Sequence, residues 1–176
     1  GKFCVGMGRL AVIDLVSPDL FPFTDGNYVL AFNGEIFNYL ELREELKRSG
    51  HVFRTASDTE VLLACWKEWG KDCLNKLNGM FAFAVYDGAT VTLVRDIAGE
   101  KPLYFRHPPT GEFTFASEAK ALGWDCEELP PAHLLQYNMK TRENIVIQRY
   151  WVPKNIEIPS YDGGAEEMLE NLLEDA

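Results

Sequence analysis

An asparagine and a glycine, Asn33-Gly34, follow a run of strand-forming residues in this 176-residue chain. Both residues tolerate positive φ, so the pair predicts a tight turn at the end of a buried strand. The Asn33 side chain supplies an amide donor, and Gly34 supplies a backbone N–H that no Cβ obstructs. Two such donors are the materials of an oxyanion hole. An ordinary strand-ending turn explains the same residues, and one Asn-Gly pair does not decide between the two.

Two charged residues could recognise a ligand. Arg9 is the only charged residue between Phe3 and Ile13, and its guanidinium is a forked donor that fits a carboxylate. Asp58 follows Ser57, where a helix is expected to begin, and the helix dipole there favours a carboxylate even without a ligand. A structural role is the alternative for each residue: an ion pair or a solvent-extended side chain for Arg9, and helix stabilisation for Asp58.

The cysteines do not indicate a metal site. Cys4, Cys65, Cys73 and Cys126 form no C-x-x-C pair and share no paired spacing with the three histidines. We expect reduced, mostly buried thiols. The phosphate-loop, dinucleotide-binding and zinc-protease motifs do not occur in the sequence. We therefore expect neither a metal nor a cofactor in these residues.

Charge and hydropathy limit the class of protein. The chain has 17 Lys and Arg against 27 Asp and Glu, a net charge of −10, which argues against non-specific binding to nucleic acid or an anionic membrane. No apolar run approaches the roughly 18 to 20 residues of a membrane-spanning helix, and no secretory signal opens the chain. We therefore expect a cytoplasmic enzyme with no nucleic-acid or membrane partner.

The apolar pattern predicts a mainly antiparallel sheet protein with two helices inserted early. One helix should begin at Asn38, with Glu41 in the capping-box position, and a second at Ser57, with Glu60 in that position. The expected helices cover residues 38–49 and 57–70, one or two helical turns are expected at 117–122, and the expected strands cover residues 28–33, 52–55, 80–87, 90–95, 103–106, 112–116, 134–138 and 145–151.

Residues 1–152 are predicted to form one domain, which is long enough to bury a sizeable core. Residues 153–164 are punctuated by proline and glycine, as in a linker. Residues 165–176 place four apolar side chains in one helical stripe, which predicts the start of the first helix of a following, truncated domain. Because Gly1 stands where a translated chain has Met, inside an apolar run, we expect an internal fragment of a longer protein.

Six blocks of sequence carry a family resemblance. RLAVIDL, AFNGEIFNYLELREEL, SDTEVLL, LNGMFAFAVYD, RDIAGEKPLYF and FASEAKAL stand in this order between Gly8 and Leu122. In that order they resemble the glutamine-hydrolysing domain of asparagine synthetases, and the segment from Pro130 to Trp151 resembles the family's last strands. The resemblance implies a class II glutamine amidotransferase with the N-terminal-nucleophile fold. That fold is α+β: two antiparallel sheets between helical layers, an αββα sandwich.

The resemblance also assigns site residues. Arg9 matches the arginine that holds the glutamine α-carboxylate, and Asp58 matches the acid that receives the α-ammonium. Asn33 and Gly34 match the oxyanion-hole pair, which are the catalytic residues implied here and also contact glutamine. Glu35 follows them in the pocket wall. Backbone groups of four further residues line the same pocket: Leu10, Ala11, Val12 and Ile13.

One departure from the family concerns the nucleophile. The family uses a cysteine at the mature N-terminus, whose own amino group serves as the general base, whereas this chain begins with Gly1. Cys4 is not expected to replace it, because Cys4 lies immediately before RLAVIDL while the family's cysteine opens an earlier strand. We expect Cys4 to be a buried strand thiol and the isolated chain to lack glutaminase activity.

For the parent protein, the resemblance implies hydrolysis of glutamine to glutamate and ammonia, followed by ATP-dependent amidation of aspartate. ATP and Mg²⁺ are expected only in a following synthetase domain. That domain and glutamine are the expected partners, and a homodimer stays open. Two alternatives remain: an amidotransferase that acts on a sugar or antibiotic precursor, and a non-catalytic pseudo-amidotransferase module.

Overall fold

The computed structural model describes residues 3–7, 22–108, 112–142, 145–153 and 170–171. Among these residues, six strands form one sheet in the order β1-β2-β3-β4-β8-β9, and three form a second sheet in the order β6-β5-β7. The larger sheet contains β1 (Phe23–Asp25), β2 (Tyr28–Ile36), β3 (Gly79–Tyr86), β4 (Thr90–Arg95), β8 (His133–Asn138) and β9 (Val146–Arg149). The smaller sheet contains β5 (Tyr104–Arg106), β6 (Thr114–Ala116) and β7 (Glu127–Glu128). All paired strands are antiparallel, which confirms the predicted sheet type.

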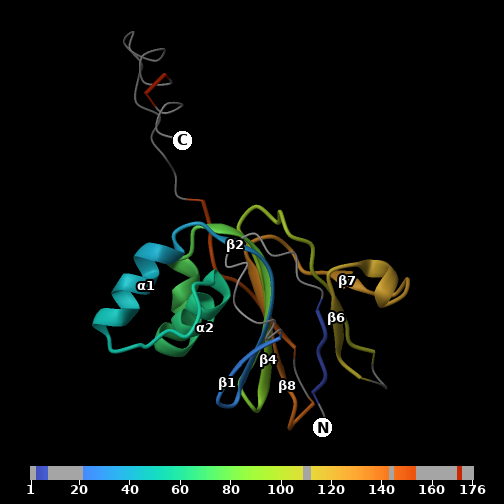
Figure 1. The fold of residues 1–176 in the computed structure, drawn as a ribbon. Helices are drawn as coiled ribbons and strands as arrows, with labels where there is room; N and C mark the ends of the chain where they lie inside the picture. Colours follow the sequence, from blue (N-terminus) through green and yellow to red (C-terminus); the bar gives the residue numbers. More distant parts are fainter. Residues whose placement is uncertain (1–2, 8–21, 109–111, 143–144, 154–169, 172–176) are drawn as a thin grey trace.

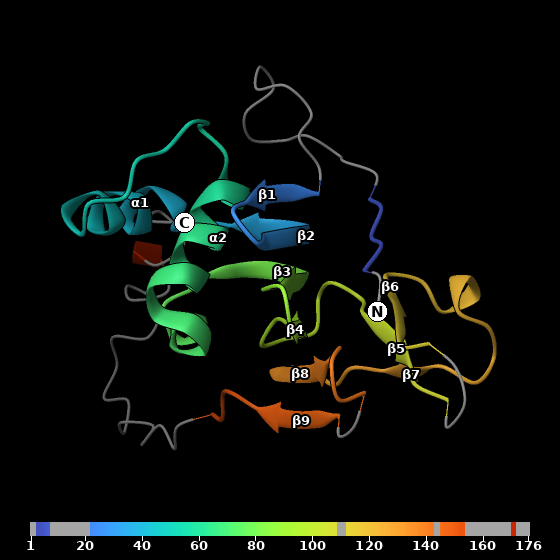
Figure 2. The same ribbon diagram turned by 90° about the horizontal axis from the view of Figure 1, so that it is seen from below.

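The longer helices lie on one face of the larger sheet. They are α1 (Tyr39–Arg48) and α2 (Asp58–Trp69), which runs into the 3-10 helix η1 (Gly70–Asn75). Figure 1 shows α1 and α2 on one side of the larger sheet and the smaller sheet on the other, and Figure 2 shows the same layers from below. In the part of the chain that the structure describes, the short 3-10 helix η2 (Ala119–Ala121) is the only helix after η1 apart from the two residues at 170–171. A second helical layer remains a prediction.

The alternation of side chains along β3 explains this layering. Phe81, Phe83 and Val85 belong to the apolar core beneath the helices, whereas Ala82 and Ala84 belong to the core between the two sheets. Successive side chains of a strand point to opposite faces, so a nearly continuous apolar run has both of its faces covered. The nearly continuous apolar run at residues 80–87 predicts a strand covered on both faces, and the structure confirms it.

The predicted start of α2 at Ser57 is confirmed, and the Glu60 side chain also binds the backbone that precedes the cap. The Ser57 hydroxyl accepts from the Glu60 N–H at 3.3 Å, which satisfies one free donor of the first turn. The Glu60 carboxylate accepts from the backbone N–H groups of Arg54, at 2.9 Å, and Thr55, at 2.7 Å. Residues 52–55 therefore form a loop held to the helix instead of the predicted strand.

The predicted turn at Asn33-Gly34 is wrong, because β2 continues through it to Ile36. Gly34 pairs with Phe81 and Ile36 pairs with Gly79 across the β2–β3 ladder. A Cβ on Gly34 would lie 2.1 Å from the Met80 carbonyl oxygen, and one on Gly79 would lie 2.1 Å from the Glu35 carbonyl oxygen. The two glycines therefore permit close approach of two strands, and the φ of 149° at Gly34 is one that other residues rarely adopt.

Asn38 precedes α1 as predicted, but its side chain does not cap the helix. Its Nδ2 donates to the Lys76 carbonyl and its Oδ1 accepts from the Asn78 N–H, both at 2.9 Å. The side chain thus joins the start of α1 to the segment that enters β3. The local capping pattern failed because backbone groups about forty residues away take the hydrogen bonds of the Asn38 side chain.

The remaining predicted elements are partly covered. The final hairpin is present as β8 and β9, with His133 opposite Arg149, and the helical turn near 117–122 is η2. None of the helices among the described residues is long and apolar enough to cross a membrane. Residues 154–169 and 172–176 lie outside the described residues, so the linker and the C-terminal helix of a following domain remain predictions.

Candidate functional site

One end of the larger sheet, at which several strands begin or stop, contains the segments of the candidate site, and we call this end of the sheet its edge. Because the strands are antiparallel, the end of β2 at Ile36 lies beside the start of β3 at Gly79. The end of β4 at Arg95 and the start of β8 near His133 lie at the same edge. Residues 33–35 are the part of β2 that approaches this edge, and we call them the β2 edge. The first residue of α2, Asp58, contacts Ile36, which directly follows the β2 edge.

The backbone direction at Gly34 follows from its neighbours. The Ile36 N–H donates to Asp58 Oδ2 at 3.1 Å, whereas the Phe37 N–H donates to the Asn78 carbonyl at 2.8 Å, on the β3 side. Successive N–H groups of a strand point to opposite edges, so the Gly34 N–H points the same way as that of Ile36, away from β3. Strand β1 pairs with β2 only from residue 28 to residue 30, so β1 does not cover Gly34.

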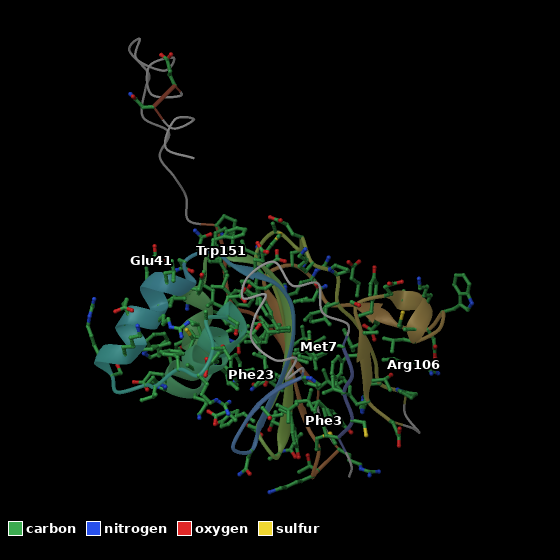
Figure 3. All side chains as sticks on the ribbon, viewed as in Figure 1. Phe3, Met7, Phe23, Glu41, Arg106 and Trp151 are labelled. Atoms are coloured by element: carbon green, nitrogen blue, oxygen red, sulfur yellow. The ribbon has the colours of Figure 1, made fainter. Side chains whose placement is uncertain are left out.

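The Asn33 side chain lies on the face of β2 that looks toward the smaller sheet. Phe32 and Ile36 lie on the opposite face of the strand from Asn33 and belong to the core beneath the helices. Asn33 is exposed. Asn33 lines a cavity of about 710 Å³ between the two sheets. Figure 3 shows Phe3 and Met7, which also line this cavity, beside the larger sheet on the side of the smaller one.

Asp58 is the second element of the site and comes from a different part of the chain. Its carboxyl group is buried, with 6% of the residue exposed, at the first position of α2. Burial raises the pKa of Asp58, the negative charge of Glu35 raises it further, and the N–H groups of Ile36 and Thr59 oppose the shift. A cation bound beside Asp58 and Glu35 would relieve both the desolvation and the repulsion of the two carboxylates.

The structure thus brings together part of the predicted site. Asp58 contacts β2 two residues beyond Gly34, and Asn33, Gly34 and Glu35 are consecutive in that strand. Arg9 and residues 10–13, which were predicted to bind the glutamine carboxylate and line the pocket, lie outside the described residues. Their roles remain predictions.

The cysteines differ from expectation at one position. Cys65 and Cys73 are buried as predicted, and burial raises the pKa of Cys65 to about 12 and that of Cys73 well above its ordinary value. Cys4 is exposed and lines the cavity that Asn33 lines, so the prediction of a buried strand thiol is wrong there. Residues 3–7 form no strand and all line the cavity, and Cys4 is exposed there.

Sequence reasoning missed a buried acid near this edge. Asp96 is 1% exposed, although the glycine and charged residues of 96–102 predict a loop. No local signal in the sequence marks this burial, because one of the backbone groups that hold the Asp96 carboxylate is the Phe81 N–H, fifteen residues earlier in the chain. Among the described residues, no group of three or more His, Cys, Asp or Glu side chains could hold a metal ion.

Comparison with known proteins places these observations in a family. Residues 1–144 match the family described as glutamine amidotransferase domain. The chain is 42% identical over 122 residues to asparagine synthetase [glutamine-hydrolyzing] 3 of Bacillus subtilis, which covers 66% of this chain and 20% of the relative. It is 39% identical over 160 residues to asparagine synthetase [glutamine-hydrolyzing] 2 of Arabidopsis thaliana, which covers 86% of this chain and 26% of the relative.

A solved structure agrees with the sequence match. The glutamine phosphoribosylpyrophosphate amidotransferase of B. subtilis, complexed with ADP and GMP, superimposes with a TM-score of 0.63 at 27% identity, covering 74% of this chain and 31% of that one. The chain spans about a fifth of the length of the first B. subtilis relative. The chain therefore belongs to the glutamine amidotransferase domain family, and it matches the class II domain found in the N-terminal region of asparagine synthetases.

Proposed function

We propose that this segment binds glutamine at the β2 edge and forms the glutaminase part of an asparagine synthetase-like enzyme. The observation that carries the proposal is the contact between Asp58 and the Ile36 N–H at 3.1 Å. It brings an acid from the head of α2 to the strand that contains Asn33, Gly34 and Glu35. The B. subtilis and A. thaliana relatives are named as glutamine-hydrolysing asparagine synthetases, which supports the choice of glutamine.

In this proposal Asp58, assisted by Glu35, receives the α-ammonium of glutamine. The physical reason is the raised pKa of Asp58: burial and the nearby Glu35 outweigh the backbone N–H groups that oppose the shift. An ammonium group would stabilise both ionised carboxylates. Arg9 takes the α-carboxylate through its guanidinium fork, and the backbone of residues 10–13 lines the pocket. These last roles rest on the family resemblance alone.

The reacting amide lies next to Asn33 and Gly34 in this proposal. The Gly34 N–H points away from β3, and the Asn33 amide is exposed toward the cavity. Attack on the glutamine side-chain amide generates an oxyanion, and loss of one oxyanion donor typically costs about a hundredfold or more in rate. Cys65 and Cys73 are unsuited as nucleophiles, because the thiolate is the reactive form and burial raises the pKa of both.

For the whole protein we retain the nucleophile that the resemblance implies, a cysteine at the mature N-terminus. Cys4 is the competing candidate, because it is exposed in the cavity that Asn33 lines. The two are separated by glutaminase assays on the natural protein that contains these residues. Cys4→Ser is expected to leave the rate unchanged, and loss of glutamate release in that variant would make Cys4 the nucleophile.

The rest of the reaction belongs to the parent protein. We propose that the ammonia amidates aspartate in an ATP- and Mg²⁺-dependent synthetase domain, that the protein is cytoplasmic, and that the completed fold is an αββα sandwich. An acceptor other than aspartate, such as a sugar or antibiotic precursor, would leave the glutamine site unchanged. Amidation assays on the natural protein with aspartate and ATP test this part separately.

The test of the glutamine site uses two ligands that differ only in the ammonium group. L-glutamine and glutaramate, which lacks the α-amino group, are titrated calorimetrically into the 176-residue chain and into Asp58→Asn. A charge-assisted hydrogen bond contributes about 1.5 to 3 kcal/mol, so glutamine should bind the variant about ten- to a hundredfold more weakly. Glutaramate should bind both proteins alike.

Asp72→Asn is the matched control, because Asp72 is an exposed aspartate near the start of η1. It should leave the affinity for both ligands unchanged. An equal loss for glutamine and glutaramate in Asp58→Asn would contradict the role of Asp58 in ammonium binding. Glutamine binding without glutamate release by the natural protein would favour the non-catalytic module.

A further inference from the structure

A second buried carboxylate lies on the far side of β3 from the proposed site. Asp96 directly follows β4, and its two carboxylate oxygens accept four backbone hydrogen bonds. Oδ1 accepts from Ala98 and Glu100, each at 3.0 Å. Oδ2 accepts from Lys101, at 3.0 Å, and from Phe81 in β3, at 3.2 Å. This carboxylate therefore joins the end of one strand, its following loop and the neighbouring strand.

The contact with Phe81 completes the β3–β4 ladder where β4 has ended. The Asp96 N–H donates to the Phe81 carbonyl at 2.8 Å, as in a regular antiparallel pair. The return bond would need the Asp96 carbonyl, but that carbonyl instead accepts from the Ala132 N–H at 2.8 Å and the Gly99 N–H at 3.2 Å. The Asp96 side chain takes its place, so the Phe81 N–H keeps a partner on the β4 side.

Phe81 is the residue that Gly34 faces across the β2–β3 ladder. Since the N–H and C=O of Phe81 are both engaged toward β4, this pair exchanges no hydrogen bonds, and the Gly34 N–H is left to point the other way. The two strands are also unusually close here, because a Cβ on Gly34 would lie 2.7 Å from the Phe81 Cα. A change in the position of Phe81 must therefore be transmitted to Gly34.

We infer that Asp96 is a positioning residue for the oxyanion-hole donor, acting on Gly34 through Phe81. This inference rests on the proposed function, in which the Gly34 N–H stabilises the oxyanion. Among the described residues, no hydrogen bond of Asp96 reaches Asp58 or residues 33–35, so in this proposal Asp96 sets where the donor lies and not how tightly glutamine is held. Its effect is expected on the rate of hydrolysis more than on substrate affinity.

The experiment compares Asp96→Asn with Asp87→Asn. Asparagine keeps the shape of Asp96 but replaces one acceptor oxygen by an NH₂ group, which cannot accept from a backbone N–H. Asp87 is the matched control, because its Oδ1 accepts from the N–H groups of Ala89, at 2.9 Å, and Thr90, at 2.7 Å, in the exposed turn at the opposite end of β3. Both variants thus disturb a carboxylate that binds backbone amides.

The first readout is the amide NMR signal of Gly34 in the 176-residue chain, which does not depend on any activity. We expect Asp96→Asn to shift the Gly34 and Phe81 signals and Asp87→Asn to leave them in place. The second readout is glutamine hydrolysis by the natural protein. There kcat should fall about tenfold in Asp96→Asn while KM changes less than about threefold, the pattern of a lost transition-state interaction.

Two kinds of failure can be told apart. If the natural protein neither binds nor hydrolyses glutamine, the proposed function fails, while the Gly34 signal still tests the coupling to Asp96. If the Gly34 signal is unmoved, or KM rises while kcat is unchanged, the inference is overturned. Should Asp96→Asn not fold, Asp96→Glu retains both oxygens with a longer reach and should also shift Gly34. Failure of both variants to fold would make Asp96 a purely structural residue and overturn the inference.

Discussion

Replacement of Gly34 by alanine tests the geometry of the proposed oxyanion-hole donor. The new Cβ would lie 2.1 Å from the Met80 carbonyl oxygen and 2.7 Å from the Phe81 Cα, both backbone atoms that cannot move independently. Overpacking of this kind costs about 1 to 3 kcal/mol. The φ of 149° adds strain of about 1 to 3 kcal/mol for a residue with a side chain. We therefore expect Gly34→Ala to lower the free energy of unfolding by about 2 to 6 kcal/mol.

Two other glycines separate these contributions. At Gly79, which has no positive φ, a Cβ would lie 2.1 Å from the Glu35 carbonyl oxygen, so Gly79→Ala should show the steric cost alone. Gly26 has a φ of 61°, and a Cβ added there would meet no atom within 4 Å, so Gly26→Ala should show only conformational strain of about 1 to 2 kcal/mol. The assay is urea denaturation of wild type and the three variants, followed by circular dichroism.

The expected order of stability is wild type, Gly26→Ala, Gly79→Ala and Gly34→Ala as the least stable. Since domains of this size are stable by about 5 to 15 kcal/mol, Gly34→Ala should unfold at clearly lower urea. A cost for Gly34→Ala no larger than that for Gly26→Ala would refute the reasoning, because it would mean that β2 and β3 do not approach closely at this position.

Three further predictions concern other groups. The pKa of Asp58 is raised above its ordinary 3.8, so the stability linked to its protonated form is present below pH 3.8 and lost as pH rises through the raised value. At pH 7, Asp58→Asn should therefore unfold at a higher temperature than wild type in thermal melts. The difference should vanish below about pH 3.8. Thiol-reactive reagents at about pH 8 should label exposed Cys4 first and should label Cys65 and Cys73 only in denaturant. Mass spectrometry measures the labelling of each cysteine. Rapid labelling of Cys65 or Cys73 in the folded chain would contradict its burial. Tyr150→Phe removes a hydrogen bond of 2.8 Å to the Arg95 carbonyl and should cost about 1 kcal/mol in urea denaturation; no change would show that this bond is not formed in solution.

Local patterns predicted the elements whose reasons are local. The Ser57 cap needs only residues within its own first turn, and the apolar run of β3 indicates burial on both faces whatever covers it. Both predictions are confirmed. The family resemblance, which depends on six ordered blocks, also predicted that Asp58 and residues 33–35 belong to one site. The structure brings these residues to the same edge.

Patterns failed where a distant partner decides the local conformation. Asn33-Gly34 has the composition of a turn, but β3, more than forty residues away, extends β2 through it. Asn38 has the composition of a cap, but the segment at Lys76 and Asn78 takes its side chain. Asp96 is charged and stands in a predicted loop, yet its burial depends on backbone N–H groups from β3 and from its own loop. No local signal contains this information.

The most direct test of the glutamine site is NMR mapping of L-glutamine onto the amide signals of the 176-residue chain. We predict saturable shifts, with a Kd of about 1 mM or tighter, for Gly34, Glu35 and Asp58. Signals of Asp87 and Gly88, in the turn at the other end of β3, should stay in place. Shifts confined to other parts of the molecule, or none in a folded chain, would contradict a glutamine site at the β2 edge.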